Sequence, residues 1–174
     1  MKTAQIVGID PGLRDTGVVH MTFDPDIKMM SVSTLVVHHS DVDTTSKYVK
    51  DWLDSKPVID PPRIFIERYV PRPGMSTSAS MTELERGLVM SLPRAELVRN
   101  TGVKQIIPQD LMQMLKMWTF STPTNHDDLR AAARIGLYGM AKDVQLNKIL
   151  ADVVRALLDG EPWLVDRRAG DVCG

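Results

Sequence analysis

Four carboxylates are the residues of this sequence whose type and placement could do chemistry together. Asp10 and Glu67 each follow a short apolar run, and Asp127 and Asp128 are adjacent further along the chain. A carboxylate at the mouth of a buried strand is costly unless something pairs with it, and a divalent metal ion is the usual partner. Asp10 therefore predicts a metal site. The alternative at position 10 is a hairpin with a surface aspartate. The alternative at 127–128 is a pair of aspartates that only stabilises the dipole of a helix that begins there.

Two strands must position the first two acids. The run Ala4–Ile9 is short, apolar and rich in β-branched residues, which is typical of a strand buried on both faces, and a Pro-Gly pair then turns the chain into a hairpin. In a second strand, Arg63–Tyr69, alternation places Glu67 on the same side as Phe65. If the two strands are parallel neighbours, Asp10 and Glu67 meet at one edge of the sheet.

The remaining pattern predicts strands and helices that alternate along the chain, and hence an α/β fold. Cap-forming residues before His126 predict that a helix carries Asp127 and Asp128. Further strands are expected over residues 29–37 and 103–107. Further helices are expected over 43–55, 82–92 with one or two more turns over 94–99, 111–117 and 143–158, followed by a loose tail over 167–174.

Composition limits the class of protein. At 174 residues the chain should form one domain, which we assign to residues 1–160, with 161–174 as a C-terminal tail. The single cysteine, Cys173, and the lack of a signal peptide or membrane-spanning run predict a cytoplasmic protein. The net charge of −1 argues mildly against nucleic acid, but the segment Arg63–Lys104 carries seven basic and four acidic residues. That segment is either a DNA-binding surface or a solvated helix face.

The first motif also resembles a known family. Gly-Ile-Asp-Pro-Gly-Leu at residues 8–13, followed by Thr16-Gly17, is similar to the first motif of the RuvC-like Holliday junction resolvases, a branch of the ribonuclease H-like nucleases. Sugar-kinase and actin-like ATPases open in a similar way, but they are longer and need further phosphate loops, which we do not find here. The resemblance runs from Lys2 to Met140. It implies a ribonuclease H-like fold with a mixed central sheet flanked by helices, in a phage-type member.

The resemblance implies a role for each acid. Asp10 would bridge two Mg²⁺ or Mn²⁺ ions about 4 Å apart, and Glu67 and Asp128 would complete their shells. The family places its last two acids three residues apart on one helical face. In the register that starts at Asp128, the second acid is replaced by Ala131, and in the register that starts at Asp127 it is replaced by Arg130. Either the chain is an inactivated variant, or it builds its site from Asp10, Glu67, Asp127 and Asp128.

The resemblance also implies partners. Branched DNA would be the substrate, a four-way junction or a fork, and a homodimer would place two sites on it, in the cytoplasm of a bacterial host if the protein is phage-encoded. Tyr69 would stack on opened bases, unless it is an ordinary core or rim tyrosine. Lys104 would touch the DNA backbone, unless it is a plain exposed lysine, and Arg68 and Arg72 belong to the basic segment. A fork or flap nuclease and a non-catalytic junction-binding protein are the alternative functions.

Overall fold

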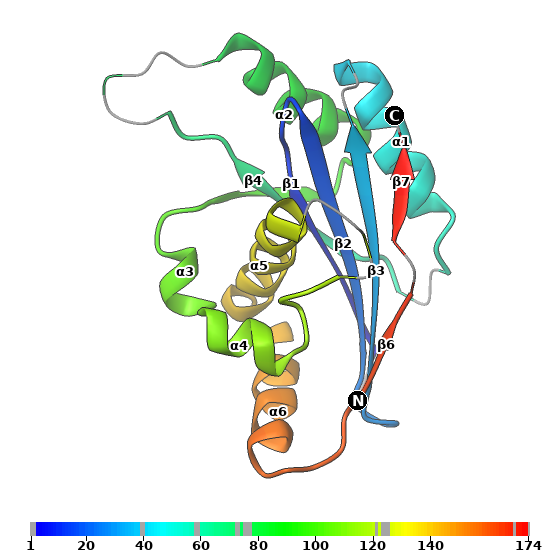
Figure 1. Ribbon diagram of the computed structural model, residues 1–174, viewed down its shortest axis with the longest axis vertical. Coiled ribbons are helices and arrows are strands. Elements are labelled where there is room, and N and C mark those ends of the chain that lie inside the picture. The colour runs from blue at the N-terminus through cyan, green and yellow to red at the C-terminus, as the bar shows by residue number, and fades with distance from the viewer. Residues whose placement is uncertain are drawn as a thin grey trace.

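A mixed β-sheet forms the centre of the computed structural model, which describes residues 3–38, 41–57, 60–71, 74, 78–120, 122, 126–168 and 170–173 (Figure 1). Its strands are β1 (Ala4–Asp10), β2 (Asp15–Asp24), β3 (Met29–His38), β4 (Arg63–Arg68), β5 (Ala95–Arg99), β6 (Leu164–Arg167) and β7 (Asp171–Cys173). Their order is β5-β4-β1-β2-β3-β6, and β7 also pairs with β3. Because β1, β4 and β5 are parallel, their carboxyl ends meet at one edge.

Helices cover both faces of this sheet. They are α1 (Val42–Asp54), α2 (Ala79–Ser91), α3 (Val103–Ile106), α4 (Gln109–Met114), α5 (His126–Lys142) and α6 (Leu146–Leu158). Helices α1 and α2 pack on one face, whereas α5 crosses the other face with α3, α4 and α6 around it (Figure 1). This arrangement confirms the predicted mixed sheet with flanking helices. None of the helices in the described ranges combines the length and apolarity needed to cross a membrane.

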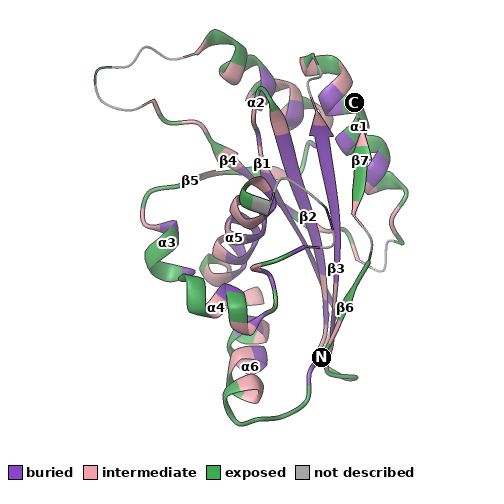
Figure 2. Cartoon of the chain, in the orientation of Figure 1, coloured by how far each residue is buried: buried purple, intermediate pink, exposed green. Residues whose placement is uncertain are grey.

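Side-chain alternation along β4 divides the core in two. Ile64 and Ile66 join the cluster under α1 and α2, whereas Phe65 joins the cluster under α5. The buried residues lie along the inner strands and on the helix surfaces that face them (Figure 2). This confirms the alternation expected from the sequence. Glu67 follows Ile66 in β4, so it lies on the same side of the sheet as Phe65, which is the α5 side.

Helix α5 lies so close to the sheet that glycine is required where they meet. A Cβ atom on Gly8 of β1 would lie 1.9 Å from the carbonyl oxygen of Ala132, and one on Gly17 of β2 would lie 2.7 Å from the carbonyl oxygen of Asp128. Neither position can carry a side chain unless the helix moves. Because Gly17 is paired with Asp10 across the β1–β2 ladder, the same contact seats Asp128 over the end of β1.

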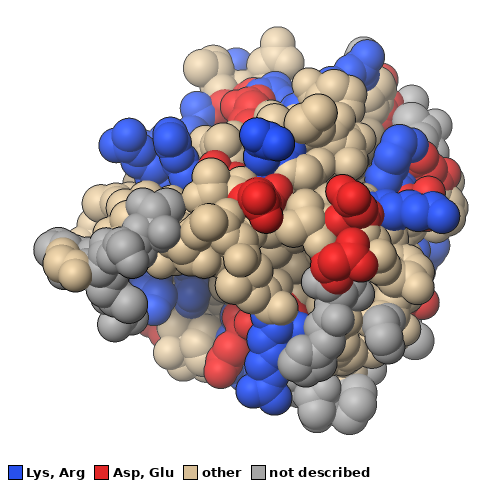
Figure 3. All heavy atoms as spheres, turned by 90° about the horizontal axis from the view of Figure 1, so that it is seen from above, with Lys and Arg blue, Asp and Glu red and all other residues tan. Residues whose placement is uncertain are grey.

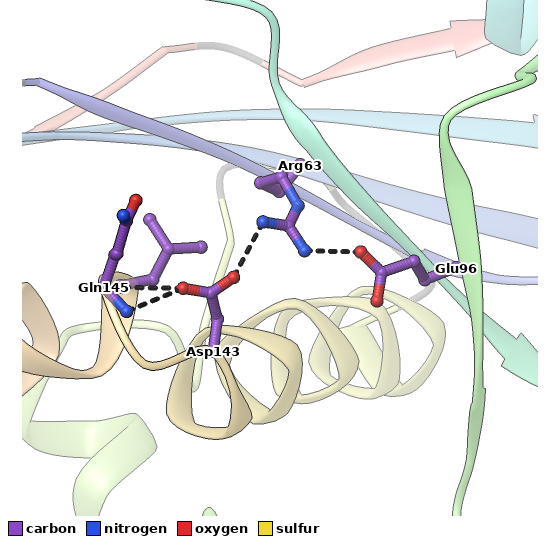
Figure 4. Close-up of polar contacts among 5 residues, drawn as sticks. Arg63, Glu96, Asp143 and Gln145 are labelled. Carbon is purple, nitrogen blue, oxygen red and sulfur yellow. Dashed lines mark hydrogen bonds and ion pairs between the residues drawn. The ribbon is translucent and has the colours of Figure 1, made fainter.

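A cluster of polar side chains holds the C-terminal end of α5 in place, at the end away from Asp128. Arg63 of β4 bonds both to Glu96 of β5 and to Asp143, which follows α5, the latter at 2.7 Å (Figure 4). Asp143 also accepts hydrogen bonds from the backbone N–H groups of Gln145 at 2.8 Å and Leu146 at 3.0 Å, at the start of α6. Arg63 is 45% exposed, so this group adds little free energy of unfolding but fixes how α5 leaves the sheet.

Two of the differences from the sequence predictions lie between β4 and α4. The further helical turns expected over 94–99 are wrong, because this segment is β5 and pairs with the free edge of β4, with Ala95 opposite Ile64. The strand expected over 103–107 is also wrong, since residues 103–106 form α3. Gly102 has a φ of +80°, which ends the extended chain, and Val103 and Ile107 are then both buried at helical spacing.

The expected loose tail is wrong as well. Strand β6 runs parallel to β3 with Leu164 opposite Met29, and β7 does so further along with Val172 opposite Val36. Backbone hydrogen bonding to the open edge of β3 orders this segment, even though most of its side chains are exposed. A short polar segment gives no local sign of such a long-range pairing.

Candidate nuclease active site

Two carboxyl groups meet where β1 and β4 end. Ile9 lies opposite Ile66 in the parallel ladder, so Asp10 and Glu67 follow as neighbours, and their side chains share a hydrogen bond. In the view onto this end of the molecule, acidic side chains gather near the middle with basic side chains around them (Figure 3). The predicted meeting of the two acids at one sheet edge is thus confirmed. Their catalytic role stays a prediction.

The environment of Asp10 disfavours its charge. Burial, followed by the negative charge and the hydrogen bond of Glu67 and then by the charge of Asp128, raises the pKa of Asp10 from 3.8 to about 8. In the metal-free protein at neutral pH, the Asp10–Glu67 pair therefore holds a proton. A cation placed between the two groups would take the place of this proton.

Of the two adjacent aspartates, Asp128 lies nearer the pair. Its backbone packs on Gly17, it is half-buried, and its charge acts on Asp10. The side chain of Asp127 is 94% exposed, and its carboxylate pairs with Arg130 at 2.8 Å. The sequence left open which aspartate joins the site, and this geometry favours Asp128.

Ala131 faces a cleft beside Glu67. The cleft has a volume of about 520 Å³ and lies between α5 and the α3–α4 segment, and both residues line it. A longer side chain at position 131 would therefore extend into the cleft that Glu67 also lines. The register in which Ala131 stands at the position of the missing acid is compatible with this placement, because an aspartate there would share the cleft with Glu67.

Two arginines on α5 give the cleft a basic wall, a role that sequence reasoning did not assign to them. The guanidinium of Arg130 lies 4.3 Å from the ring centre of Trp118, and its Nε donates to the Trp118 carbonyl at 2.6 Å. The Nε of Arg134 donates to the carbonyl of Ile107 at 3.0 Å, and burial, followed by the charge of Arg130, lowers the Arg134 pKa. Their spacing of four residues on one helix was the available signal.

Asn100 is a further residue that sequence reasoning missed. It follows β5 directly, and its amide Nδ2 donates to Oε1 of Glu67. It lines the same cleft as Glu67 and Ala131. The wrong helical prediction for residues 94–99 hid it, because only the parallel pairing of β5 with β4 brings it to the site.

The predicted DNA contacts lie around this cleft and beyond it. Lys104 lines the cleft, although it stands on α3 and not on a strand. Arg68 is exposed at the end of β4, and Tyr69 is half-buried, with its backbone N–H donating to Glu85 at 3.0 Å. Arg72 lies outside the described residues. Base stacking by Tyr69 and DNA contacts by the three basic residues stay predictions.

The donor set can be compared with what a metal ion requires. Within the described ranges, no three Asp, Glu, His or Cys side chains are arranged to hold a metal ion together. The Asp10–Glu67 pair nevertheless suits a hard divalent ion, since Mg²⁺ prefers oxygen ligands and is often bound through one or two protein carboxylates. A bound cation would also relieve the repulsion that raises the pKa of Asp10. The pair fits such an ion, with Asp128 as the next acid.

Comparisons with known proteins identify the fold. No family model matches the sequence, and no curated protein matches it. A Thermus thermophilus RuvC structure in complex with a Holliday junction substrate is similar, with a TM-score of 0.59 at 13% identity over 87% of this chain and 96% of that chain. Another T. thermophilus RuvC structure has a TM-score of 0.57 at 13% identity over 88% and 97%. The large-terminase nuclease domain of bacteriophage SPP1, solved with bound Mn, scores 0.44 at 13% over 80% and 86%, which is too low for an argument.

The chain therefore has the ribonuclease H-like fold of RuvC, as expected from its first motif. At 13% identity this similarity shows the fold alone, so an argument about activity depends on the acids and the cleft.

Proposed function

We propose that this protein is a metal-dependent endonuclease that hydrolyses phosphodiester bonds in branched DNA and resolves four-way junctions. The observation that carries the proposal is the hydrogen-bonded Asp10–Glu67 pair at the carboxyl ends of two parallel strands, with Asp128 of α5 beside it. The fold holds Asp10 against a second carboxyl group even though this raises the free energy of its ionisation. A surface aspartate with no function would not need such a neighbour.

In this proposal the sheet and α5 hold the metal site between them. Asp10 and Glu67 would hold a Mg²⁺ or Mn²⁺ ion from the sheet, and Asp128 would join from the helix, with a second ion at the same site. Such ions supply an activated water and stabilise the leaving oxygen of an in-line displacement. Asp10 would release its proton to solvent when it binds the ion. Gly8 and Gly17 keep α5 close enough for Asp128 to take part.

The cleft would receive the DNA backbone. Lys104 and Arg134 line it next to Glu67, and Arg130 is held there by Trp118. Positively charged groups beside the acids can bind the phosphates that flank the scissile bond. Arg68 and Tyr69 would contact DNA further along the same end of the molecule, Arg68 through the phosphates and Tyr69 through base stacking. Arg72, which lies outside the described residues, would add another phosphate contact.

Ala131 sets the expected level of activity. Without a carboxylate at this position, the site has fewer charged ligands, so we expect weak metal binding and weak cleavage. The chain would then be an impaired resolvase that still binds its junction. A homodimer would place two such sites on the two strands of a symmetric junction. Location in a bacterial cytoplasm and a phage origin stay part of this proposal.

The test is nicking of an end-labelled synthetic four-way junction in Mn²⁺, with the unmodified chain, Ala131→Asp and Asp10→Asn compared. We expect the Ala131→Asp variant to make paired, symmetric nicks, the unmodified chain to cut weakly or not at all, and Asp10→Asn to be inactive. Cleavage of forks or flaps in preference to junctions would indicate the alternative nuclease. Junction binding without cleavage in all three proteins would indicate a non-catalytic binding protein and contradict the proposal.

A further inference from the structure

We propose that Asn100 supplies the ligand that Ala131 cannot, as a neutral oxygen donor to the metal ion held by Asp10 and Glu67. The inference rests on the proposed function, because it concerns the same site. It gives the site a third protein ligand from the sheet, besides any contribution from Asp128.

Strand geometry places Asn100 on the same side of the sheet as the acids. Glu67 is paired with Val98 in the parallel β4–β5 ladder, and Val98 packs against the core under α5. Asn100 is two residues further on, so an extended chain directs its side chain to the same side as that of Val98. The bond from Asn100 Nδ2 to Glu67 Oε1 agrees with this direction. The ends of β1, β4 and β5 thus contribute Asp10, Glu67 and Asn100 to one edge.

Asn100 and Ala131 line the same cleft, and Asn100 is hydrogen-bonded to the carboxylate of Glu67 there. Both residues line it together with Glu67. Ala131 comes from α5 and offers only a methyl group, whereas Asn100 comes from the sheet side and offers an amide. The residue that follows β5 can therefore offer a ligand beside Glu67, from within the cleft into which an acid at position 131 would extend.

The amide is suited to both states of the site. In the metal-free protein, Asn100 donates its N–H to Glu67. Rotation of the terminal amide by half a turn exchanges this donor for the carbonyl oxygen, and amide oxygens are ordinary ligands of hard divalent ions. Because the amide is neutral, it adds a ligand without adding to the repulsion between Asp10, Glu67 and Asp128.

The test is a double-mutant cycle on Mn²⁺ affinity, measured by calorimetry and by the loss of the free Mn²⁺ electron paramagnetic resonance signal. Its members are the unmodified chain, Asn100→Ala, Ala131→Asp and the double variant. We expect Asn100→Ala to weaken Mn²⁺ binding about tenfold in the unmodified chain but no more than about twofold when Asp is present at position 131. Gln109→Ala, which removes another amide of the same cleft, should leave the affinity unchanged. Far-UV circular dichroism of each metal-free variant checks the fold.

The outcomes separate this inference from the proposed function. If Asn100→Ala leaves the Mn²⁺ affinity of the unmodified chain unchanged, the inference is wrong although the metal site stands. Asn100→Ala could instead weaken Mn²⁺ binding equally in the unmodified chain and in Ala131→Asp. Asn100 would then only hold Glu67 in place, and the proposal that it replaces the acid missing at position 131 would be refuted. If no member of the cycle binds Mn²⁺, the proposed function fails, and the inference fails with it.

Discussion

Replacing Asp10 by Asn should stabilise the metal-free protein at neutral and alkaline pH. The asparagine has nearly the same shape as the aspartate and can still hydrogen-bond to Glu67, but it cannot ionise. In the native protein, burial, Glu67 and Asp128 all disfavour the charge of Asp10. A residue that destabilises the fold while serving a metal site is expected where function and stability compete.

The magnitude follows from the pKa. The pKa of Asp10 rises from 3.8 in the unfolded chain to about 8 in the native one, and each unit corresponds to about 1.4 kcal/mol. Between these two values the native state binds one more proton than the unfolded state, so the free energy of unfolding falls as pH rises, by at most about 1.4 kcal/mol per pH unit. This contribution is complete below the unfolded pKa and is lost as pH rises through the native one. The full loss is on the order of 6 kcal/mol.

The assay is urea unfolding of both proteins in EDTA at a series of pH values from 5 to 9. We expect the difference in free energy of unfolding, Asp10→Asn minus unmodified, to grow steadily with pH and then level off near pH 8. Addition of Mn²⁺ should stabilise only the unmodified chain. Asp127→Asn is the matched control, since that carboxylate is exposed, and its difference curve should be flat. Parallel pH profiles for Asp10→Asn and the unmodified chain would refute the reasoning.

Three further results are expected. Burial, followed by the charges of Lys56 and Arg168, lowers the pKa of His20 from 6.5 to about 4, so stability should fall as pH drops through this interval, and His20→Gln should remove that dependence in urea unfolding. Gly8→Ala should cost about 3 kcal/mol or more, or prevent folding, because its methyl group would meet the backbone of α5; thermal unfolding measures this, and a loss below about 1 kcal/mol would contradict the close packing. In an Ala131→Asp background, Asp128→Asn should abolish junction nicking whereas Asp127→Asn should leave most of it, and the reverse result would show that the wrong aspartate was chosen.

The parts of the fold that depend on strong local patterns were predictable. The run Ala4–Ile9 is apolar enough to indicate a buried strand, and alternation in the strand Arg63–Tyr69 correctly placed Phe65 on one side of the sheet and its isoleucine neighbours on the other. These two strands are enough to predict that Asp10 and Glu67 meet at one edge of the sheet, as they do.

The parts that depend on distant partners were not predictable. Residues 95–99 carry helix-compatible side chains, but the unpaired edge of β4 makes them a strand. Residues 164–167 and 171–173 are short and mostly exposed, yet they pair with β3. The same long-range pairing brings Asn100 to Glu67, so its place in the site was hidden for the same reason. The sequence left open which of Asp127 and Asp128 joins the site. The packing of α5 on Gly17 and the exposure of Asp127 distinguish them.

The central claim is that Asp10 and Glu67 form a divalent-metal site in a nuclease. Anomalous diffraction from crystals of the Ala131→Asp variant grown with Mn²⁺ tests it most directly. We expect a manganese peak bonded to one carboxylate oxygen of each residue, with Asp128 directed at it, and we expect no peak there in Asp10→Asn crystals. A well-ordered Asp10–Glu67 pair that keeps its hydrogen bond with no manganese beside it, in saturating Mn²⁺, would contradict the account.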